Sequence, residues 1–143
     1  MIRPLYVWEH PLIVPLAREF HAATGVGAVF SEERLLSALQ LNKSHVVGRF
    51  HEGRLIGILV GIVAPHFLTE SVLAQELMWY VSPEFRGSAV SNLAMLDSFE
   101  RWAKACGADS VAMVALEKGP PKLGQFYENR GFTRVESNYL KFF

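Results

Sequence analysis

The sequence predicts one domain of the mixed α/β class, and three observations lead to that prediction. The chain has 143 residues, which is enough to bury a proper core within one domain. No internal repeat, low-complexity tract or linker divides residues 1–143. Segments of helical and of strand-like hydrophobic spacing alternate, so we expect a strand, two helices, three strands, a helix, a strand, a helix and two strands.

The first third of the chain predicts one strand and two helices. Residues 3–8 (RPLYVW) can form a short strand. Residues 11–23 carry apolar side chains at helical spacing, Pro11 is acceptable in a first turn, and residues 24–27 (TGVG) end that helix. Ser31, followed by two glutamates, is typical of an N-cap, so a second helix begins there.

The middle of the chain predicts an antiparallel hairpin and a further strand. Residues 45–50 (HVVGRF) and 55–64 (LIGILVGIVA) are rich in strand-forming residues and flank a turn that contains Glu-Gly. Residues 71–81 (SVLAQELMWYV) are a strand candidate that propensity alone leaves ambiguous. Strict alternation would separate two faces of this strand: Gln75, Leu77 and Trp79 on one, and Glu76, Met78 and Tyr80 on the other.

The clearest helix covers residues 89–106, and Gly107 is its expected end. Its apolar side chains fall on one face: Met95, Leu96, Phe99, Trp102, Ala103 and Cys106. We therefore interpret Cys106 as a small core residue and not as a nucleophile.

The last part of the chain predicts one helix and three strands. Residues 110–116 (SVAMVAL) are typical of a buried strand, and residues 122–130 of a short helix that ends at Gly131. Residues 132–136 (FTRVE) and 138–143 (NYLKFF) predict a final pair of strands.

Composition argues against several classes of function. Lys and Arg together number 14, as do Asp and Glu, so no overall field draws the protein to nucleic acid or to an anionic membrane. The apolar run at 55–65 is shorter than the roughly 20 residues of a membrane span, and the N-terminus lacks the pattern of a signal peptide. The single cysteine is typical of a reducing compartment, so we expect a cytoplasmic protein. The five histidines show no metal-binding spacing, and we expect no metal.

Residues 81–93 (VSPEFRGSAVSNL) place Gly87 and several small residues where a strand gives way to a helix. One interpretation is a tight turn. The other is that phosphates approach the free amides of residues 87–90 at the start of the helix, with Arg86 adding charge at the rim. A P-loop is excluded because no Gly-Lys-Ser/Thr follows. A dinucleotide-binding fingerprint is disfavoured because Gly25-Val26-Gly27 lies between two predicted helices and does not follow a strand.

The wider context favours the phosphate interpretation. The V-x-P-x-x-R-G turn is followed by a helix, a buried strand and then QFYENRGF at 125–132. Over roughly residues 46–141 this order resembles the GNAT superfamily of acyl-CoA-dependent N-acetyltransferases. The resemblance implies a mixed, mostly antiparallel sheet of about seven strands with four helices, and transfer of an acetyl group from acetyl-CoA to a primary amine by direct attack.

The resemblance also assigns site residues. Acetyl-CoA would lie between the strands at 72–81 and 110–116, with its pantetheine along the first and its pyrophosphate at the following turn. The implied binding residues are Met78, Trp79, Tyr80, Val81, Arg86, Gly87, Ser88, Ala89, Val90 and Ser91.

Two residues are implied for catalysis. Tyr127 matches the tyrosine of the family's F-Y-x-x-x-G-F motif and would protonate the leaving thiolate, the alternative being a core aromatic. Glu76 stands alone as an acid in an apolar strand and is the candidate base, the alternative being a solvated or paired carboxylate. His66, in the loop before that strand, is a weaker candidate for the base.

Two departures from the family pattern leave a second hypothesis open. Ala89 stands where the family usually has a glycine, and Pro120 falls near the place of an asparagine that meets the pantetheine. The alternative is therefore a catalytically inactive module that binds CoA or another protein. The acceptor is not determined by the sequence, although residues 22–30 and 136–139 would contact it. The apolar end of the chain is a plausible edge for a homodimer.

Overall fold

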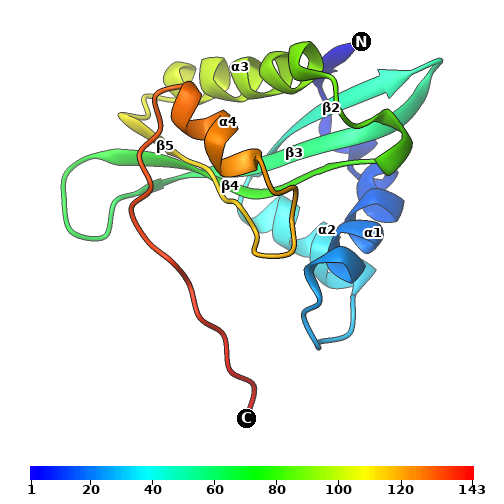
Figure 1. Ribbon diagram of the computed structural model, residues 1–143, viewed down its shortest axis with the longest axis horizontal. Helices are drawn as coiled ribbons and strands as arrows, with labels where there is room; N and C mark the ends of the chain where they lie inside the picture. The colour runs from blue at the N-terminus through cyan, green and yellow to red at the C-terminus, as the bar shows by residue number, and fades with distance from the viewer.

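The computed structural model describes residues 1–143 and contains one five-stranded sheet with helices on both faces (Figure 1). The strands are β1 (Ile2–Pro4), β2 (His45–His51), β3 (Arg54–Pro65), β4 (Val72–Val81) and β5 (Ser110–Ala112). The helices are η1 (Val7–Ile13), α1 (Val14–Thr24), α2 (Glu32–Leu41), η2 (Pro83–Phe85), α3 (Ala89–Ala105) and α4 (Leu123–Asn129). The strands follow one another in chain order, and every pair is antiparallel except β4 with β5.

The beginning of the chain differs from the prediction in where the first helix starts. Residues 7–13 form the 3-10 helix η1, which contains Pro11, and α1 begins only at Val14. Pro15 then occupies the first turn of α1, where its missing amide hydrogen costs no hydrogen bond. The prediction for α2 is confirmed, since the Ser31 side chain accepts a hydrogen bond from the Arg34 amide at 3.1 Å.

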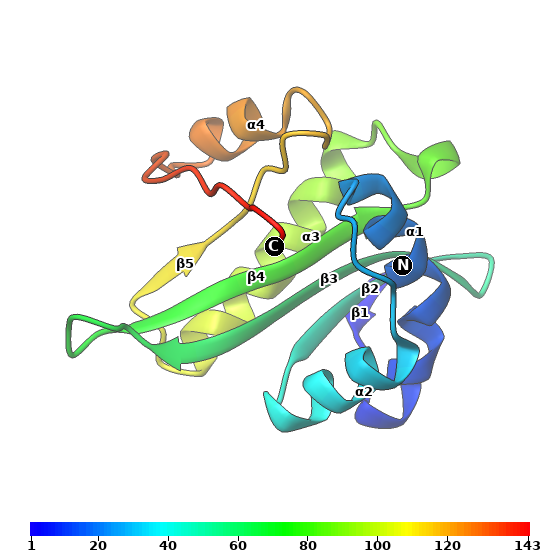
Figure 2. The ribbon, with the colours of Figure 1, turned by 90° about the horizontal axis from the view of Figure 1, so that it is seen from below.

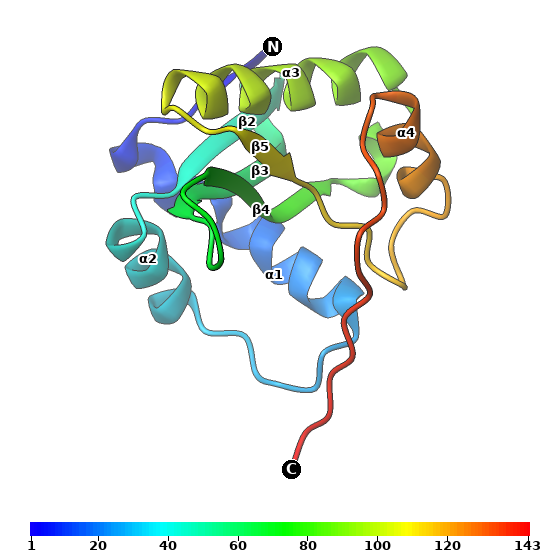
Figure 3. The same cartoon turned by 90° about the vertical axis from the view of Figure 1, so that its left-hand side faces the viewer.

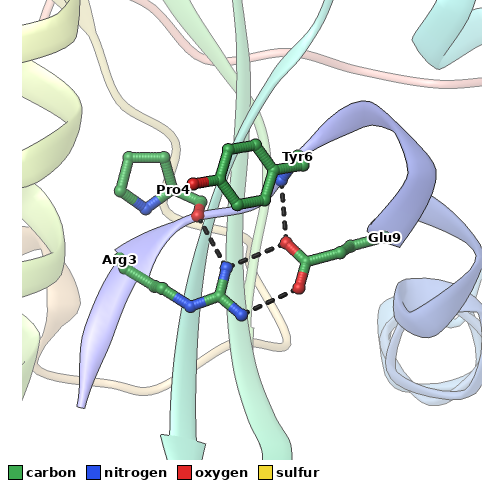
Figure 4. Close-up of polar contacts among 4 residues, drawn as sticks. All are labelled: Arg3, Pro4, Tyr6 and Glu9. Atoms are coloured by element: carbon green, nitrogen blue, oxygen red, sulfur yellow. Dashed lines mark hydrogen bonds and ion pairs between the residues drawn. The ribbon is translucent and has the colours of Figure 1, made fainter.

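A local ion pair ties β1 to η1 (Figure 4). The two terminal nitrogens of Arg3 each lie 2.8 Å from one carboxylate oxygen of Glu9, a bidentate arrangement. The same carboxylate accepts the Tyr6 amide at 2.8 Å, which caps the start of η1. Hydrogen bonding from Arg3 lowers the pKa of Glu9 to about 2. The pair fixes the direction in which the chain leaves the sheet toward α1.

The sheet separates two apolar cores. Helices α1 and α2 cover one face and α3 covers the other, as Figures 1 and 3 show. Alternate residues of the central strands supply both cores: Val46 and Val60 face α1, whereas Val47 and Leu59 face α3. Burial on both faces explains why β3 is an almost continuous apolar run. None of the helices has the length and apolar composition needed to cross a bilayer.

A β-bulge in β4 overturns the predicted alternation of this strand. Met78 pairs with Val60 and Glu76 with Gly61, so Leu77 is the extra residue. Gly61 faces the ring of Phe99 on α3, and its partner Glu76 therefore faces the same side. Glu76 and Met78 thus point to opposite faces, because the bulge moves the side chains beyond it by one register position.

The predicted strand at 110–116 is shorter in the structure. Residues 110–112 of β5 pair with residues 73–75 of β4, and the two strands diverge after Ala112 (Figure 2). The short helix predicted at 122–130 is confirmed as α4.

The predicted strands at 132–136 and 138–143 are not formed, so the sheet has five strands and not about seven. Residues 133–143 are exposed, and the segment runs away from the sheet (Figure 3). A strand needs a neighbour for its backbone groups, and β propensity does not replace one.

Helix α3 matches its prediction except at its last apolar residue. Met95, Phe99 and Ala103 are fully buried, and Gly107 has the positive φ of +81° that ends the helix. Cys106, predicted to be a core residue, is exposed. It is the C-cap, where the chain already turns out of the helix, and so lies beyond the packed face.

Candidate active site

The point at which β4 and β5 part defines the candidate site. Beyond Gln75 no strand pairs with the outer edge of β4, so no strand ladder occupies the main-chain groups along that edge. The bulge at Leu77 lies at the same place and turns the strand further away. An extended ligand can pair with this free edge as an added strand.

Glu76 and Tyr127 meet here because each forms a hydrogen bond with the main chain of Val114. A carboxylate oxygen of Glu76 (Oε2) accepts the Val114 amide at 2.6 Å. The Tyr127 hydroxyl donates to the Val114 carbonyl oxygen at 2.8 Å. Both side chains are almost completely buried, at 4% and 6% exposure. The two residues that the sequence singled out for chemistry are therefore neighbours, although 51 positions separate them in the chain.

The surroundings hold both groups in their protonated forms more strongly than water does. Burial raises the pKa of Glu76 to about 7, and the hydrogen bond from the Val114 amide offsets only part of that rise. Burial also raises the pKa of Tyr127, and the nearby Glu76 carboxylate raises it further. A carboxyl group that titrates near neutral pH is suited to accept a proton, and Tyr127, although a weaker acid than a free phenol, keeps a proton that it can donate.

Aromatic contacts fix the position of the Tyr127 ring. It lies 6.3 Å from Trp79 of β4 and 5.6 Å from Phe132, measured between ring centroids. The Phe132 amide returns to the Tyr127 carbonyl at 3.1 Å, and Gly131 between them has a φ of +91°. The glycine of the F-Y-x-x-x-G-F motif therefore allows the turn that closes α4 over the tyrosine.

The turn between β4 and α3 presents a row of unpaired amides. No acceptor of the chain contacts the amides of Gly87 and Ser88, and those of Ala89 and Val90 open the helix without internal partners. The Ser91 amide is the first that is satisfied, by the Ser88 side chain at 3.2 Å. Successive free amides at the start of a 17-residue helix are a suitable site for phosphate groups.

Gly87, and not residue 89, carries the unusual backbone conformation. Its φ is +93°, and a side chain there would meet no atom, so its surroundings are open. Ala89 is the first residue of α3 and has ordinary helical geometry. The departure at Ala89 therefore costs no backbone strain, because only Gly87 needs a conformation that favours glycine.

The other predicted binding residues have mixed surroundings. The side chains of Met78 and Tyr80 belong to the core under α1, so they could contribute to a site only through their main chain. Trp79 is half-buried beside Tyr127. The Val81 carbonyl accepts Nε of Arg86 at 2.7 Å, and the Arg86 guanidinium lies over the Tyr80 ring at 5.0 Å. Arg86 is thus held against β4.

The remaining candidates lie away from this arrangement. His66 accepts the Leu68 amide at 3.0 Å through Nδ1, within its own loop. Pro120 is exposed, and its carbonyl accepts the Leu123 amide at the start of α4. No group of three or more His, Cys, Asp or Glu side chains is placed to hold a metal ion.

Two features of the site had no signal in the sequence. Val114 acts through its main chain, and a main-chain role leaves no residue signature. The bulge at Leu77 depends on the pairing of β4 with β3. An acid isolated in an apolar strand was the one indication that this strand departs from simple packing.

Comparison with known proteins agrees with this fold. Residues 13–132 match the model of the acetyltransferase (GNAT) family. That match covers most of the chain, and the protein therefore belongs to the GNAT acetyltransferase family. The predicted family and fold class are confirmed. No curated protein matches the chain by sequence.

Several solved structures share the fold. A ribosomal-protein-alanine N-acetyltransferase from Brucella melitensis biovar Abortus 2308 superposes with a TM-score of 0.76 at 20% identity, covering 100% of this chain and 99% of the other. A predicted acetyltransferase from Clostridium acetobutylicum, solved with acetyl-CoA, gives 0.75 at 17% identity, with coverage of 99% and 94%. A putative acetyl transferase from Pyrococcus furiosus gives 0.73 at 21% identity and covers all of both chains.

Proposed function

We propose that this protein transfers an acetyl group from acetyl-CoA to a primary amine by direct attack. The observation that carries the proposal is the pairing of buried Glu76 and Tyr127 across Val114, where β4 loses its neighbour. The free amides of residues 87–90 provide the second requirement, a place for the pyrophosphate. Membership of the family and a neighbour solved with acetyl-CoA support the choice of donor.

The chemistry assigns one proton transfer to each residue. The amine nitrogen bonds to the thioester carbon, and the carbon–sulfur bond breaks. Glu76, directly or through a water, takes the proton that the amine loses, and Tyr127 gives its proton to the departing thiolate. Free main-chain groups at the edge of β4 would hold the pantetheine and polarise the carbonyl. Met78, Trp79, Tyr80 and Val81 contribute that edge, although the Val81 carbonyl must first be released by Arg86.

Two variants test these roles once an amine substrate is identified from a panel. Tyr127→Phe is expected to lower turnover by more than about tenfold with little change in CoA affinity. Tyr6→Phe, at a 59% exposed tyrosine outside the site, is the matched control. Turnover by the wild type should rise with pH through about 7, because Glu76 must be ionised to accept a proton, and Glu76→Gln should remove that rise. Wild-type turnover in Tyr127→Phe would disprove the acid role, and an unchanged pH profile in Glu76→Gln would disprove the base role.

Binding separates an enzyme from an inactive relative. Thermal unfolding with CoA and acetyl-CoA needs no acceptor, and ligand at 100 times its dissociation constant stabilises a fold by about 2.7 kcal/mol. Binding of both, without transfer to any amine, would identify a non-catalytic CoA-binding module. A melting temperature that neither ligand changes at millimolar concentration would disprove the proposal.

We propose further that the C-terminal segment 132–143 mediates homodimer formation. Its large apolar side chains are exposed, among them Val135, Tyr139, Leu140 and Phe143, and β5 offers an unpaired strand at the edge of the sheet. Exposed apolar side chains next to a free edge favour association with another chain. Light scattering of the full chain and of a chain ending at residue 131 would test this, and a full-length monomer at all concentrations would exclude it.

We also propose a cytoplasmic location and an acceptor that is a small amine or a peptide or protein amine. The single, exposed Cys106 cannot form an intramolecular disulfide, in keeping with a reducing compartment. Among the structural neighbours are enzymes named for a ribosomal-protein alanine and for aminoglycosides, so the family admits both kinds of amine.

A further inference from the structure

A cavity lies on the opposite face of β4 from Glu76 and Tyr127. It has a volume of about 190 Å³ and is bounded by α1, α2 and the sheet, with Phe20, Leu35, Ala38, Ser44, Leu77 and Met78 among its lining residues. An engineered apolar cavity of about 150 Å³ binds benzene, so this volume is sufficient for a small apolar group. If a heavy atom takes about 30 Å³, as a water does, the cavity holds about six.

The cavity begins at the point of β4 where the candidate site lies. Leu77, which lines it, is the extra residue of the bulge and directly follows Glu76 in the chain. Leu77 is 45% exposed, and no strand covers β4 at this position. A group held at the free edge of β4 therefore has Glu76 and Tyr127 on one face of the sheet and this cavity on the other.

The lining favours a neutral, apolar occupant. None of the lining residues carries a charge, and the polar ones are Asn42 and Ser44. The Ser44 hydroxyl is buried and has no hydrogen-bond partner in the protein. A protonated amine would lose its hydration here without gaining an opposite charge. A hydrocarbon chain loses nothing on entering, and its end can carry one polar group toward Ser44.

We propose that this cavity binds the acyl chain of a donor longer than acetyl-CoA, of about six carbons. The inference rests on the proposed function, because it assumes that the thioester lies at the edge of β4. The sulfur, the oxygen and the acyl chain leave the thioester carbon in one plane, in three directions. With the sulfur beside Tyr127, the chain points away from that residue, and the inference places it over Leu77, which lines the cavity. The transfer itself is unchanged: the amine displaces CoA thiol and becomes an amide.

Calorimetry with CoA, acetyl-, butyryl-, hexanoyl- and octanoyl-CoA tests the inference without any acceptor. Each buried methylene group strengthens binding by up to about fourfold. The dissociation constant of hexanoyl-CoA is therefore expected to be at least about tenfold lower than that of acetyl-CoA, with no further gain for octanoyl-CoA. Equal dissociation constants for all the thioesters, or tightest binding by acetyl-CoA, would overturn the inference while leaving the proposed function in place. If CoA and all its thioesters fail to bind, the proposed function fails, and this inference fails with it.

A cavity-filling variant locates the chain. Ala38→Leu places added volume among the lining residues on α2, and Ser37→Leu adds a larger side chain at an exposed position of the same helix. Ala38→Leu is expected to reduce the preference for hexanoyl- over acetyl-CoA by about tenfold, and Ser37→Leu to leave that ratio unchanged. A preference that survives in Ala38→Leu places the chain elsewhere and overturns the inference. If Ala38→Leu does not fold, the dissociation constants of the CoA thioesters for the wild type test the inference by themselves.

Discussion

Replacing Glu76 by Gln is expected to change how the stability of the protein depends on pH. The glutamate is 4% exposed, its carboxylate accepts the Val114 amide at 2.6 Å, and its pKa is raised to about 7, chiefly by burial. Glutamine has the same shape. Its oxygen can accept from Val114, and it cannot ionise. The variant thus keeps the packing and removes the titration.

The sign follows from the direction of the shift. A pKa raised on folding means that the native state binds the proton more tightly than the unfolded chain does. The stabilisation is complete below the unfolded value of 4.5 and is lost as the pH rises through about 7. A tenfold change in acidity is worth about 1.4 kcal/mol, so the loss is about 3 kcal/mol in all. The free energy of unfolding of the wild type, minus that of Glu76→Gln, should therefore fall by about that amount between pH 4.5 and pH 8.

One buried and one half-buried histidine, His10 and His45, titrate in the opposite direction over part of this range. Burial lowers the pKa of His45 to about 4 and also lowers that of His10, so both histidines add stability as the pH rises toward 6.5. These contributions partly cancel that of Glu76 in the wild type. Because both proteins contain the same histidines, only the difference between their unfolding free energies isolates Glu76.

Urea denaturation of both proteins at intervals from pH 4.5 to 8.5 measures this difference. Glu128→Gln removes an exposed carboxylate from α4 and controls for the change in net charge. A difference between wild type and Glu76→Gln that stays constant within about 0.5 kcal/mol would refute the reasoning. Such a result would mean that Glu76 is hydrated in solution and does not lie buried beside Tyr127.

Two glycine substitutions make further predictions with one control. Gly87→Ala forces a side chain onto a φ of +93°, which is expected to lower the free energy of unfolding by about 1–2 kcal/mol. The same change should weaken CoA binding measured by calorimetry. Unchanged affinity would mean that this turn is not part of the site. Gly61→Ala brings a methyl group into the Phe99 ring and to 2.8 Å from the Gln75 carbonyl oxygen. Overpacking of this kind costs about 1–3 kcal/mol, so thermal unfolding should show a lower melting temperature, and an unchanged one would contradict the packing. Gly27→Ala meets no atom and should behave as wild type.

Much of the fold could be predicted because its signals are local. An apolar stripe and a terminal glycine predict the α3 helix, and Ser31 predicts the start of α2. The β2–β3 hairpin follows from two strand-like runs and a turn. The start of α1 was misplaced because Pro11 and Pro15 are both acceptable in a first turn, and only the packing of η1 separates them.

The candidate site was predictable in its residues and not in its geometry. Glu76 and Tyr127 stood out by residue type and by motif, yet their meeting at Val114 requires β4, β5 and α4 to be placed in three dimensions. The predicted alternation put Glu76 on the same face as Met78, which was wrong. One unpaired residue in β4 reversed it, and such a residue is set by the register against β3.

The sequence alone thus determined the class of the protein, the order of its elements as far as α4 and the residue types available for chemistry, because these depend on neighbours along the chain. Tertiary structure decided the bulge at Leu77, the sharing of the Val114 peptide, the raised pKa of Glu76 and the apolar cavity beneath α2. Each of these depends on contacts between segments that are distant in the sequence. It also decided that residues 132–143 form no strand within this chain, since a strand exists only where another backbone pairs with it.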